Sequence, residues 1–225
     1  MFTGGKTKFL RELNAEQKRI ALAGAPYLGG YVLLTATPYS YIDLYHWDEY
    51  APYAWMAFFS WALGYLLLLL LMNDRGLFAG GKASGVGVYS GLSIVVGIFV
   101  GLALVALIVP GLYLLMRWLP VYARALTSDE WITQSMRWSW TATEEFQKPL
   151  AVASLGPLLC FGVAIVAASI FEVTPSVGYM PSTIILNLGT SAGMAWLTVL
   201  GVAAFVLLSH EHRRGLEKSA CRLPA

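Results

Sequence analysis

Five long stretches of this sequence contain no Asp, Glu, Lys or Arg, and they constrain the fold more than any other feature. A bilayer core about 30 Å thick is crossed by about 20 apolar residues in a helix, which satisfies its own backbone hydrogen bonds there. The composition agrees, because 57% of the residues are hydrophobic and 12% are charged, against roughly 45–50% and 25% in soluble domains. The sequence therefore predicts an all-α, polytopic membrane helix bundle. The charge-free stretches are residues 20–42, 51–72, 83–116, 149–171 and 173–209.

The third stretch is too long for one crossing, because its helix would exceed the core thickness by roughly 20 Å. Pro110-Gly111 is the expected break, since proline removes a backbone donor and glycine tolerates a tight connection. Residues 111–127 then either cross the membrane or form a re-entrant segment at the cytoplasmic side. We expect a single transmembrane domain, residues 20–209, with about six spans at 20–42, 52–72, 86–109, 111–127, 149–171 and 182–209.

The distribution of basic residues supports six spans with the N-terminus and the C-terminus in the cytoplasm. Residues 1–19 and 210–225 are rich in Lys and Arg, whereas residues 43–50 and 172–181 contain neither. Cytoplasmic loops carry an excess of Lys and Arg, and five spans would place the basic C-terminal tail outside. We therefore expect residues 1–19 to be a cytoplasmic N-terminal segment and residues 210–225 to be a cytoplasmic tail.

Residues 128–146 have an amphipathic pattern. On a helical wheel, Trp131, Trp140 and Phe146 share one side with small hydroxyl residues, while charged residues occupy the other side. Ser128 is placed to cap the N-terminus of this helix. The pattern predicts an interfacial helix at the cytoplasmic surface, which docks closely on other spans and also contacts lipid.

The same part of the chain carries a family resemblance over about 40 residues. Its motifs are Pro110-Gly111-Leu112-Tyr113, then Arg117, then Ser135-Met136-Arg137-Trp138-Ser139-Trp140 followed by Thr141 and Thr143. This order resembles the YciC-like group of bacterial inner-membrane proteins, which includes the membrane domain found beside some glycerophosphodiester phosphodiesterases. The resemblance implies a bacterial inner-membrane location. It implies no phosphodiesterase activity, because the catalytic barrel of those enzymes has no counterpart here.

Arg117 is expected inside the apolar zone, roughly 9 Å beyond the Pro110-Gly111 turn by helical rise. An intramembrane arginine is a functional candidate because its burial is costly. Glu172 is the first candidate partner, and the others are a lipid phosphate and the carbonyls released by Pro110 and Pro120. The alternative is a snorkelling side chain that fixes the depth of the helix.

Tryptophans and a second arginine extend this region into a candidate contact surface. Trp118, beside Arg117, is typical of an interface anchor. The interfacial helix adds aromatic residues that contact lipid or a partner. The lipid- or partner-binding candidates are Arg117, Trp118, Trp131, Trp138, Trp140 and Arg137.

The loop from Tyr39 to Tyr53 combines tyrosines with carboxylates and contains no Lys or Arg. Such a surface suits a cationic ligand or a basic partner protein. An aromatic belt at the membrane interface is the favoured alternative. The candidates for a periplasmic contact surface are Asp43, Tyr45, Trp47, Asp48 and Glu49.

Three GxxxG pairs allow helix backbones to approach each other closely. Packing inside the bundle is the favoured use, and dimerisation through the third or sixth span is the alternative. The pairs are Gly87 with Gly91, Gly97 with Gly101, and Gly189 with Gly193.

Catalysis and cofactor binding find little support in the sequence. Gly189 to Gly193 match the G-x-S-x-G pattern around Ser191, but the three histidines, His46, His210 and His212, all lie outside the spans. Without a histidine or a lysine in a span, we expect no haem and no retinal. We expect no catalytic residue, no cofactor and no metal site, since His210-Glu211-His212 is typical of a solvated tail.

The leading functional hypothesis is a non-catalytic accessory or scaffold subunit of a membrane complex, or an envelope-maintenance factor. The alternative is a transporter or binder of lipids or small amphiphiles, and an intramembrane enzyme comes third. Expected partners are membrane lipids and either other membrane-protein subunits or further copies of the chain. The net charge of +2 is too small for a nucleic-acid surface.

Overall fold

The computed structural model describes residues 3–45, 49–78, 85–106, 108–128, 130–173 and 179–220, and the regular elements in these ranges are all helices. The prediction of an all-α fold is confirmed. The helices are α1 (Thr3–Ala23), α2 (Ala25–Tyr45), α3 (Tyr50–Asp74), α4 (Val86–Ala106), α5 (Ile108–Trp118), α6 (Val121–Thr127), α7 (Ile132–Ala142), α8 (Gln147–Val173) and α9 (Tyr179–Ala220).

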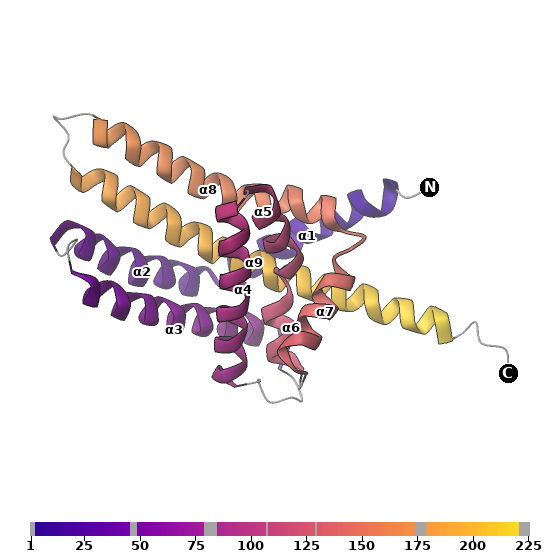
Figure 1. Ribbon diagram of the computed structural model, residues 1–225. Helices are drawn as coiled ribbons and strands as arrows, with labels where there is room; N and C mark the ends of the chain where they lie inside the picture. Colours follow the sequence, from indigo (N-terminus) through magenta and orange to yellow (C-terminus); the bar gives the residue numbers. More distant parts are fainter. Residues whose placement is uncertain are drawn as a thin grey trace.

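The long helix α9 is the centre of the fold. It packs on α1, α2, α3, α6 and α8, and its residues 199–205 are all buried, including Leu200, Val202 and Ala203. Figure 1 shows α2, α3, α8 and α9 running side by side, whereas α4 and α5 pack on each other and run across them. The core therefore lies around α9, where small side chains let several helices approach.

Four helices in the described ranges, α3, α4, α8 and α9, are long and apolar enough to cross a membrane. A fifth is gained if α1 and α2 count as one broken span, since they pass the same criteria only together. The chain is thus compatible with a multi-pass membrane protein. Residues 111–127 instead belong to two short helices, α5 and α6, which are separated at Pro120. Proline has no N–H with which to continue the hydrogen bonds of α5, so that helix ends before it.

The first predicted span begins differently from the expectation. The predicted span begins at residue 20, whereas α1 continues through this position to Ala23. The chain then breaks at Gly24, and α1 meets α2 at an angle of 74°. Pro26 lies in the first turn of α2, where it has no N–H to donate and its ring would clash with a continued α1. A Cβ at Gly24 would lie 2.4 Å from Leu71 Cδ2 of α3, so glycine lets the bend pack closely.

The break near Pro110 also differs from its predicted place. Helix α4 ends at Ala106 and α5 begins at Ile108, so Pro110 lies within the first turn of α5. Proline is tolerated in a first turn because the N–H groups there have no intrahelical partner. The reversal of direction therefore precedes the Pro-Gly pair.

The helix predicted at residues 128–146 is shorter in the structure, since α7 spans Ile132–Ala142. Ser128 does not cap it and instead ends α6, where its hydroxyl donates to the carbonyl of Arg124 at 2.9 Å. The N–H of Trp131 donates to the side chain of Gln134 at the start of α7. The prediction of Ser128 as its N-cap is therefore wrong.

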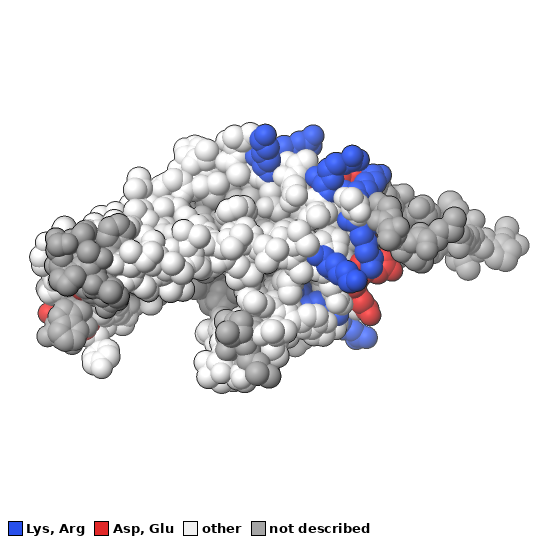
Figure 2. Space-filling view, turned by 90° about the horizontal axis from the view of Figure 1, so that it is seen from above, with Lys and Arg blue, Asp and Glu red and all other residues white. Residues whose placement is uncertain are grey.

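The charged side chains are segregated along the molecule. Figure 2 shows Lys and Arg gathered towards the end that holds α1 and α7. Asp43 and Glu49 lie at the opposite end, where α2 leads into α3. Between these ends, the visible surface is almost entirely uncharged.

Candidate functional site

Arg117 lies in the last turn of α5 and is 4% exposed. Its Nη1 donates to the carbonyl oxygen of Trp140 at 2.8 Å and to the hydroxyl of Thr143 at 3.2 Å. The guanidinium carbon lies 4.3 Å from the centre of the Trp140 ring and 5.6 Å from that of Tyr113. The cation is thus held by hydrogen bonds and by two aromatic faces.

The contact between α5 and α7 is reciprocal, because the Ser139 hydroxyl donates to the carbonyl of Arg117 at 2.6 Å. Ser135 and Ser139 of α7 and Thr143 at its C-terminus form a fully buried stripe, so small hydroxyl residues make the close contact together with Trp140, whose ring also packs on Tyr113. The Arg117 acceptor is a carbonyl of α7 and not one released by Pro110 or Pro120. The side chain of Glu172 lies outside the described part of the structure. We call Arg117, Ser139, Trp140 and Thr143 the arginine node.

The predicted tryptophans have four different environments. Trp118 is buried and packs edge-on against Phe99, so its interpretation as an interface anchor is wrong. Trp138 contacts the ring of Phe205, and Trp140 belongs to the arginine node. Trp131 is 80% exposed. Of the four, Trp131 is therefore the one whose side chain is most open to a partner or to lipid.

The outward face of α7 forms a shallow polar depression of about 420 Å³. Glu130 at its rim is paired with Arg124, which also lies over the ring of Trp138. Arg137 is exposed on this face. We call this surface, with the exposed Trp131 beside it, the α7 face; its lining residues are Glu130, Gln134, Arg137, Trp138 and Thr141.

At the opposite end of the bundle, Asp43 joins three helices. It accepts hydrogen bonds from the Tyr53 hydroxyl of α3 and from Asn187 Nδ2 of α9, both at 2.7 Å. Asn187 also donates to Ser40 at 3.3 Å. Asp43 therefore has a role in packing that the sequence analysis missed, because Asn187 is an isolated amide in a charge-free stretch.

The other residues of the predicted periplasmic surface are only partly described. Tyr45 is exposed at the end of α2, and Glu49 is the residue that precedes α3. Trp47 and Asp48 lie outside the described residues.

The three glycine pairs are used differently. A Cβ at Gly189 would lie 2.2 Å from Ala164 Cβ, and one at Gly193 would lie 2.8 Å from the Phe161 ring, so both glycines serve the contact of α9 with α8. A Cβ at Gly91 would lie 2.7 Å from Ile132 of α7. Open space surrounds the corresponding positions at Gly87, Gly97 and Gly101.

Ser191 lies buried on α9, which is a continuous helix there and has no strand-to-helix elbow. His210 lies near the far end of the same helix. Among the described residues, no three His, Cys, Asp or Glu side chains converge as metal ligands would.

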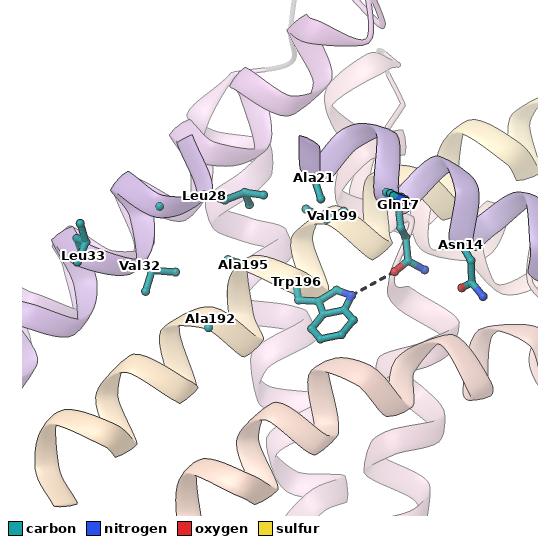
Figure 3. A pocket seen from close by; sticks show the side chains of 12 residues that line it. Asn14, Gln17, Ala21, Leu28, Val32, Leu33, Ala192, Ala195, Trp196 and Val199 are labelled. Atoms are coloured by element: carbon teal, nitrogen blue, oxygen red, sulfur yellow. Dashed lines mark hydrogen bonds between the residues drawn. The ribbon is translucent and has the colours of Figure 1, made fainter. Parts of the chain in front are cut away.

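A cavity of about 720 Å³ lies between α1, α2 and α9, in a region that the sequence analysis did not single out. We call it the α1–α2–α9 groove (Figure 3). Apart from Trp196, its α2 and α9 walls are aliphatic or glycine, whereas α1 contributes three polar side chains. They are Asn14, Gln17 and Lys18, which share one face of α1 with Ala21.

Gln17 is 8% exposed and has one half of its amide bonded. Its Oε1 accepts a hydrogen bond from the indole Nε1 of Trp196 at 3.2 Å (Figure 3). Its Nε2 is buried and has no acceptor in the described structure. An indole N–H can only donate, so the amide cannot be turned round, and its NH₂ group is the end left without an acceptor.

No protein family, no curated protein and no solved structure matches this chain.

Proposed function

We propose that this chain is a non-catalytic integral membrane protein that acts as an accessory or scaffold subunit of a membrane complex, or as an envelope-maintenance factor. The observation that carries the proposal is the α7 face. The arginine node fixes α7 to α5, while Arg137 on the outward face of α7 and Trp131, which directly precedes α7, remain exposed. Aromatic residues and arginine are enriched where proteins bind each other.

The use of the buried polar groups supports a non-catalytic role. Arg117 and Asp43 are bonded to residues of neighbouring helices, and they lie at different parts of the bundle. A catalyst needs polar groups that converge on a reacting centre. These two side chains instead fasten helices together.

The proposed topology has six crossings, with both termini in the cytoplasm of a bacterial cell. The proposed family is the YciC-like group. The gathering of Lys and Arg at the end with α1 and α7 supports the orientation. In this topology, α4 and the α5–α6 pair form the middle hairpin, which in a bilayer would have to turn away from the crosswise direction that it has in Figure 1. The turn of that hairpin would then face the periplasm.

A cysteine at position 109 tests the topology, because Val109 is strongly exposed beside the turn between α4 and α5. The background carries Cys160→Ala and Cys221→Ala, so that the new thiol is the only one. Labelling of Val109→Cys by an impermeant reagent from outside intact cells supports six crossings. Labelling only after the cells are opened contradicts them.

Extraction of the complete protein into native lipid discs, followed by mass spectrometry, tests the scaffold role. Trp131→Ala combined with Arg137→Glu is expected to release a stoichiometric partner protein. The matched control is Trp55→Ala, because Trp55 is an exposed tryptophan at the start of α3, at the opposite end of the bundle. Absence of any protein partner from the wild-type discs would contradict the scaffold role.

A second candidate function, the binding of a lipid or small amphiphile, is favoured by the α1–α2–α9 groove. The groove joins an apolar wall to a polar end, which is the chemical division of an amphiphile. An amphiphile recovered with the protein from native discs, in the absence of a protein partner, would favour this second function.

A further inference from the structure

We propose that the α1–α2–α9 groove is a binding site for a phospholipid with an anionic headgroup, which takes up one acyl chain along α2 and α9 and contacts α1 with its phosphate. This inference rests on the second candidate function, lipid binding, and is independent of the α7 face.

The shape and lining of the groove fit an acyl chain. Its volume of about 720 Å³ lies within the range of small-molecule sites, roughly 300–1,000 Å³. Ala192 and Ala195 of α9 are small, and a Cβ at Gly29 of α2 would meet nothing within 4 Å. Val32 and Leu33 add an aliphatic wall. A flexible hydrocarbon chain therefore has space and apolar contacts between these two helices.

The amide of Gln17 indicates what the polar end of the occupant must carry. Trp196 fixes its orientation, so Nε2 offers N–H groups that find no acceptor in the described structure. A buried donor without a partner costs free energy, because it has lost its hydrogen bonds to water and gained none in the protein. Figure 3 shows the amide nitrogen directed away from the indole and towards the side of Asn14. An occupant with an acceptor oxygen at this point removes that cost.

The charge of the groove selects an anion. Lys18 is the one ionisable residue among those that line it, and it is exposed at the α1 end. Glu16, the nearest acid along the helix, forms ion pairs with Arg75 and Arg19 instead. A phosphate at the α1 end thus meets an ammonium group and amide donors without an opposing carboxylate in the lining.

The position of the groove indicates that this ligand comes from the surrounding bilayer. Its polar end belongs to α1, in the part of the molecule where Lys and Arg gather, and its apolar end follows α2 towards the uncharged middle (Figures 1 and 2). A bilayer has the same order, from phosphate to hydrocarbon. A phospholipid of the surrounding leaflet therefore enters without leaving its natural depth.

The experiment measures lipid retention by the complete protein in detergent, by native mass spectrometry after incubation with phosphatidylglycerol or phosphatidylcholine. We expect phosphatidylglycerol to be retained about tenfold more strongly, because both lipids carry the phosphate but phosphatidylcholine adds a quaternary ammonium that Lys18 repels. Equal retention of the two lipids overturns the anionic preference. Inorganic phosphate is added as a competitor. If phosphate alone displaces the lipid, the proposed contribution of the acyl chain to binding is overturned.

Two neighbouring glycines provide matched variants. Gly29→Leu places a side chain in the groove, whereas Gly30→Leu adds the same side chain at a position that does not line it and where a Cβ meets nothing within 4 Å. We expect Gly29→Leu to lower phosphatidylglycerol retention by about tenfold. Gly30→Leu is expected to leave it at the wild-type level. Equal effects of the two variants overturn the site.

A surface variant keeps the proposal testable if Gly29→Leu does not fold. Lys18→Glu changes an exposed side chain and reverses the charge at the polar end. Retention of phosphatidylglycerol is expected to fall while retention of phosphatidylcholine is unchanged. An unchanged preference in Lys18→Glu contradicts the headgroup assignment. Loss of a protein partner from Trp131→Ala discs concerns the scaffold role alone, so the two proposals fail separately.

Discussion

Arg117 and Gln17 are both long polar side chains buried among apolar residues, but their surroundings differ. Arg117 meets a carbonyl and a hydroxyl of α7 and lies between two aromatic rings. Its Nε has no acceptor in the described structure, yet the guanidinium as a whole is enclosed by these contacts. Gln17 has one bonded atom and one unbonded atom, and it lines an open groove.

The difference separates two uses of a buried polar group. A group enclosed by protein acceptors stabilises the arrangement of helices, because removing it leaves those acceptors unpaired. A donor that lines a cavity without an acceptor stabilises whatever ligand supplies one. The arginine node therefore belongs to the fold, and the α1–α2–α9 groove belongs to function. The predictions below test this separation.

The largest effect is expected for Arg117→Leu, which removes the hydrogen bonds of a charged donor and leaves the Trp140 carbonyl with only the longer contact to the Thr143 hydroxyl, at 3.3 Å. We expect the free energy of unfolding to fall by about 2–3 kcal/mol, measured by denaturant titration in mixed micelles. Arg137→Leu on the exposed side of α7 is the control and is expected to change stability by less than about 0.5 kcal/mol. Equal stability of the two variants would show that the arginine node does not hold α7.

Ser139→Ala tests the reciprocal bond of the arginine node. Its loss leaves the Arg117 carbonyl without its donor in a fully buried site, so the free energy of unfolding is expected to fall by about 1–2 kcal/mol. Thr141→Ala is the matched control, because Thr141 is an exposed hydroxyl residue of the same helix. If both variants unfold at the same denaturant concentration, the bond contributes nothing measurable.

Trp196→Phe tests the hydrogen bond between Trp196 and Gln17 in the α1–α2–α9 groove. The substitution keeps an aromatic ring but removes the indole N–H, so the Gln17 amide is free to turn. We expect the free energy of unfolding to fall by roughly 0.5–1 kcal/mol, the net value of one hydrogen bond. Phosphatidylglycerol retention is expected to fall as well, because the NH₂ group is no longer fixed towards the groove. A stability loss as large as that of Arg117→Leu would remove the distinction between the two regions.

Gly29→Ala is expected to have an effect as small as that of Trp196→Phe, with the opposite sign. A Cβ at this position meets open space, so the gain in helix propensity raises the free energy of unfolding by about 0.5–1 kcal/mol. Gly189→Ala is the contrasting variant, since its Cβ would overlap Ala164 and lower stability. Thermal unfolding of both proteins distinguishes an open groove wall from a closed helix contact.

Much of the fold follows from the charge-free stretches, because each helix that passes as a membrane span coincides with one of them. Boundaries are less predictable. Helix α4 ends at Ala106, four residues before Pro110, which lies in the first turn of α5, where proline is tolerated. The sequence pattern also predicts that α7 lies on other helices, but it cannot show that Ser139, Thr143 and Trp140 converge on Arg117.

The groove escaped the sequence analysis for a definite reason. The charges of residues 1–19 predict a cytoplasmic segment, but Phe9 and Leu13, followed by Ile20, mark an apolar helix face that the structure buries. Asn14, Gln17 and Lys18 follow the same helical period, which was the available signal. The partner of Gln17 is Trp196, near the other end of the chain, and no local pattern can predict that contact.

The most direct test of the separation is the stabilisation by phosphatidylglycerol of the wild type, Arg117→Leu and Gln17→Met, each unfolded with and without the lipid. A ligand at one hundred times its dissociation constant stabilises a protein by about 2.7 kcal/mol. We predict that Arg117→Leu is less stable in both conditions but keeps the full stabilisation by lipid. Gln17→Met is predicted to lose most of that stabilisation. Loss of the lipid effect in Arg117→Leu together with its retention in Gln17→Met would contradict the account.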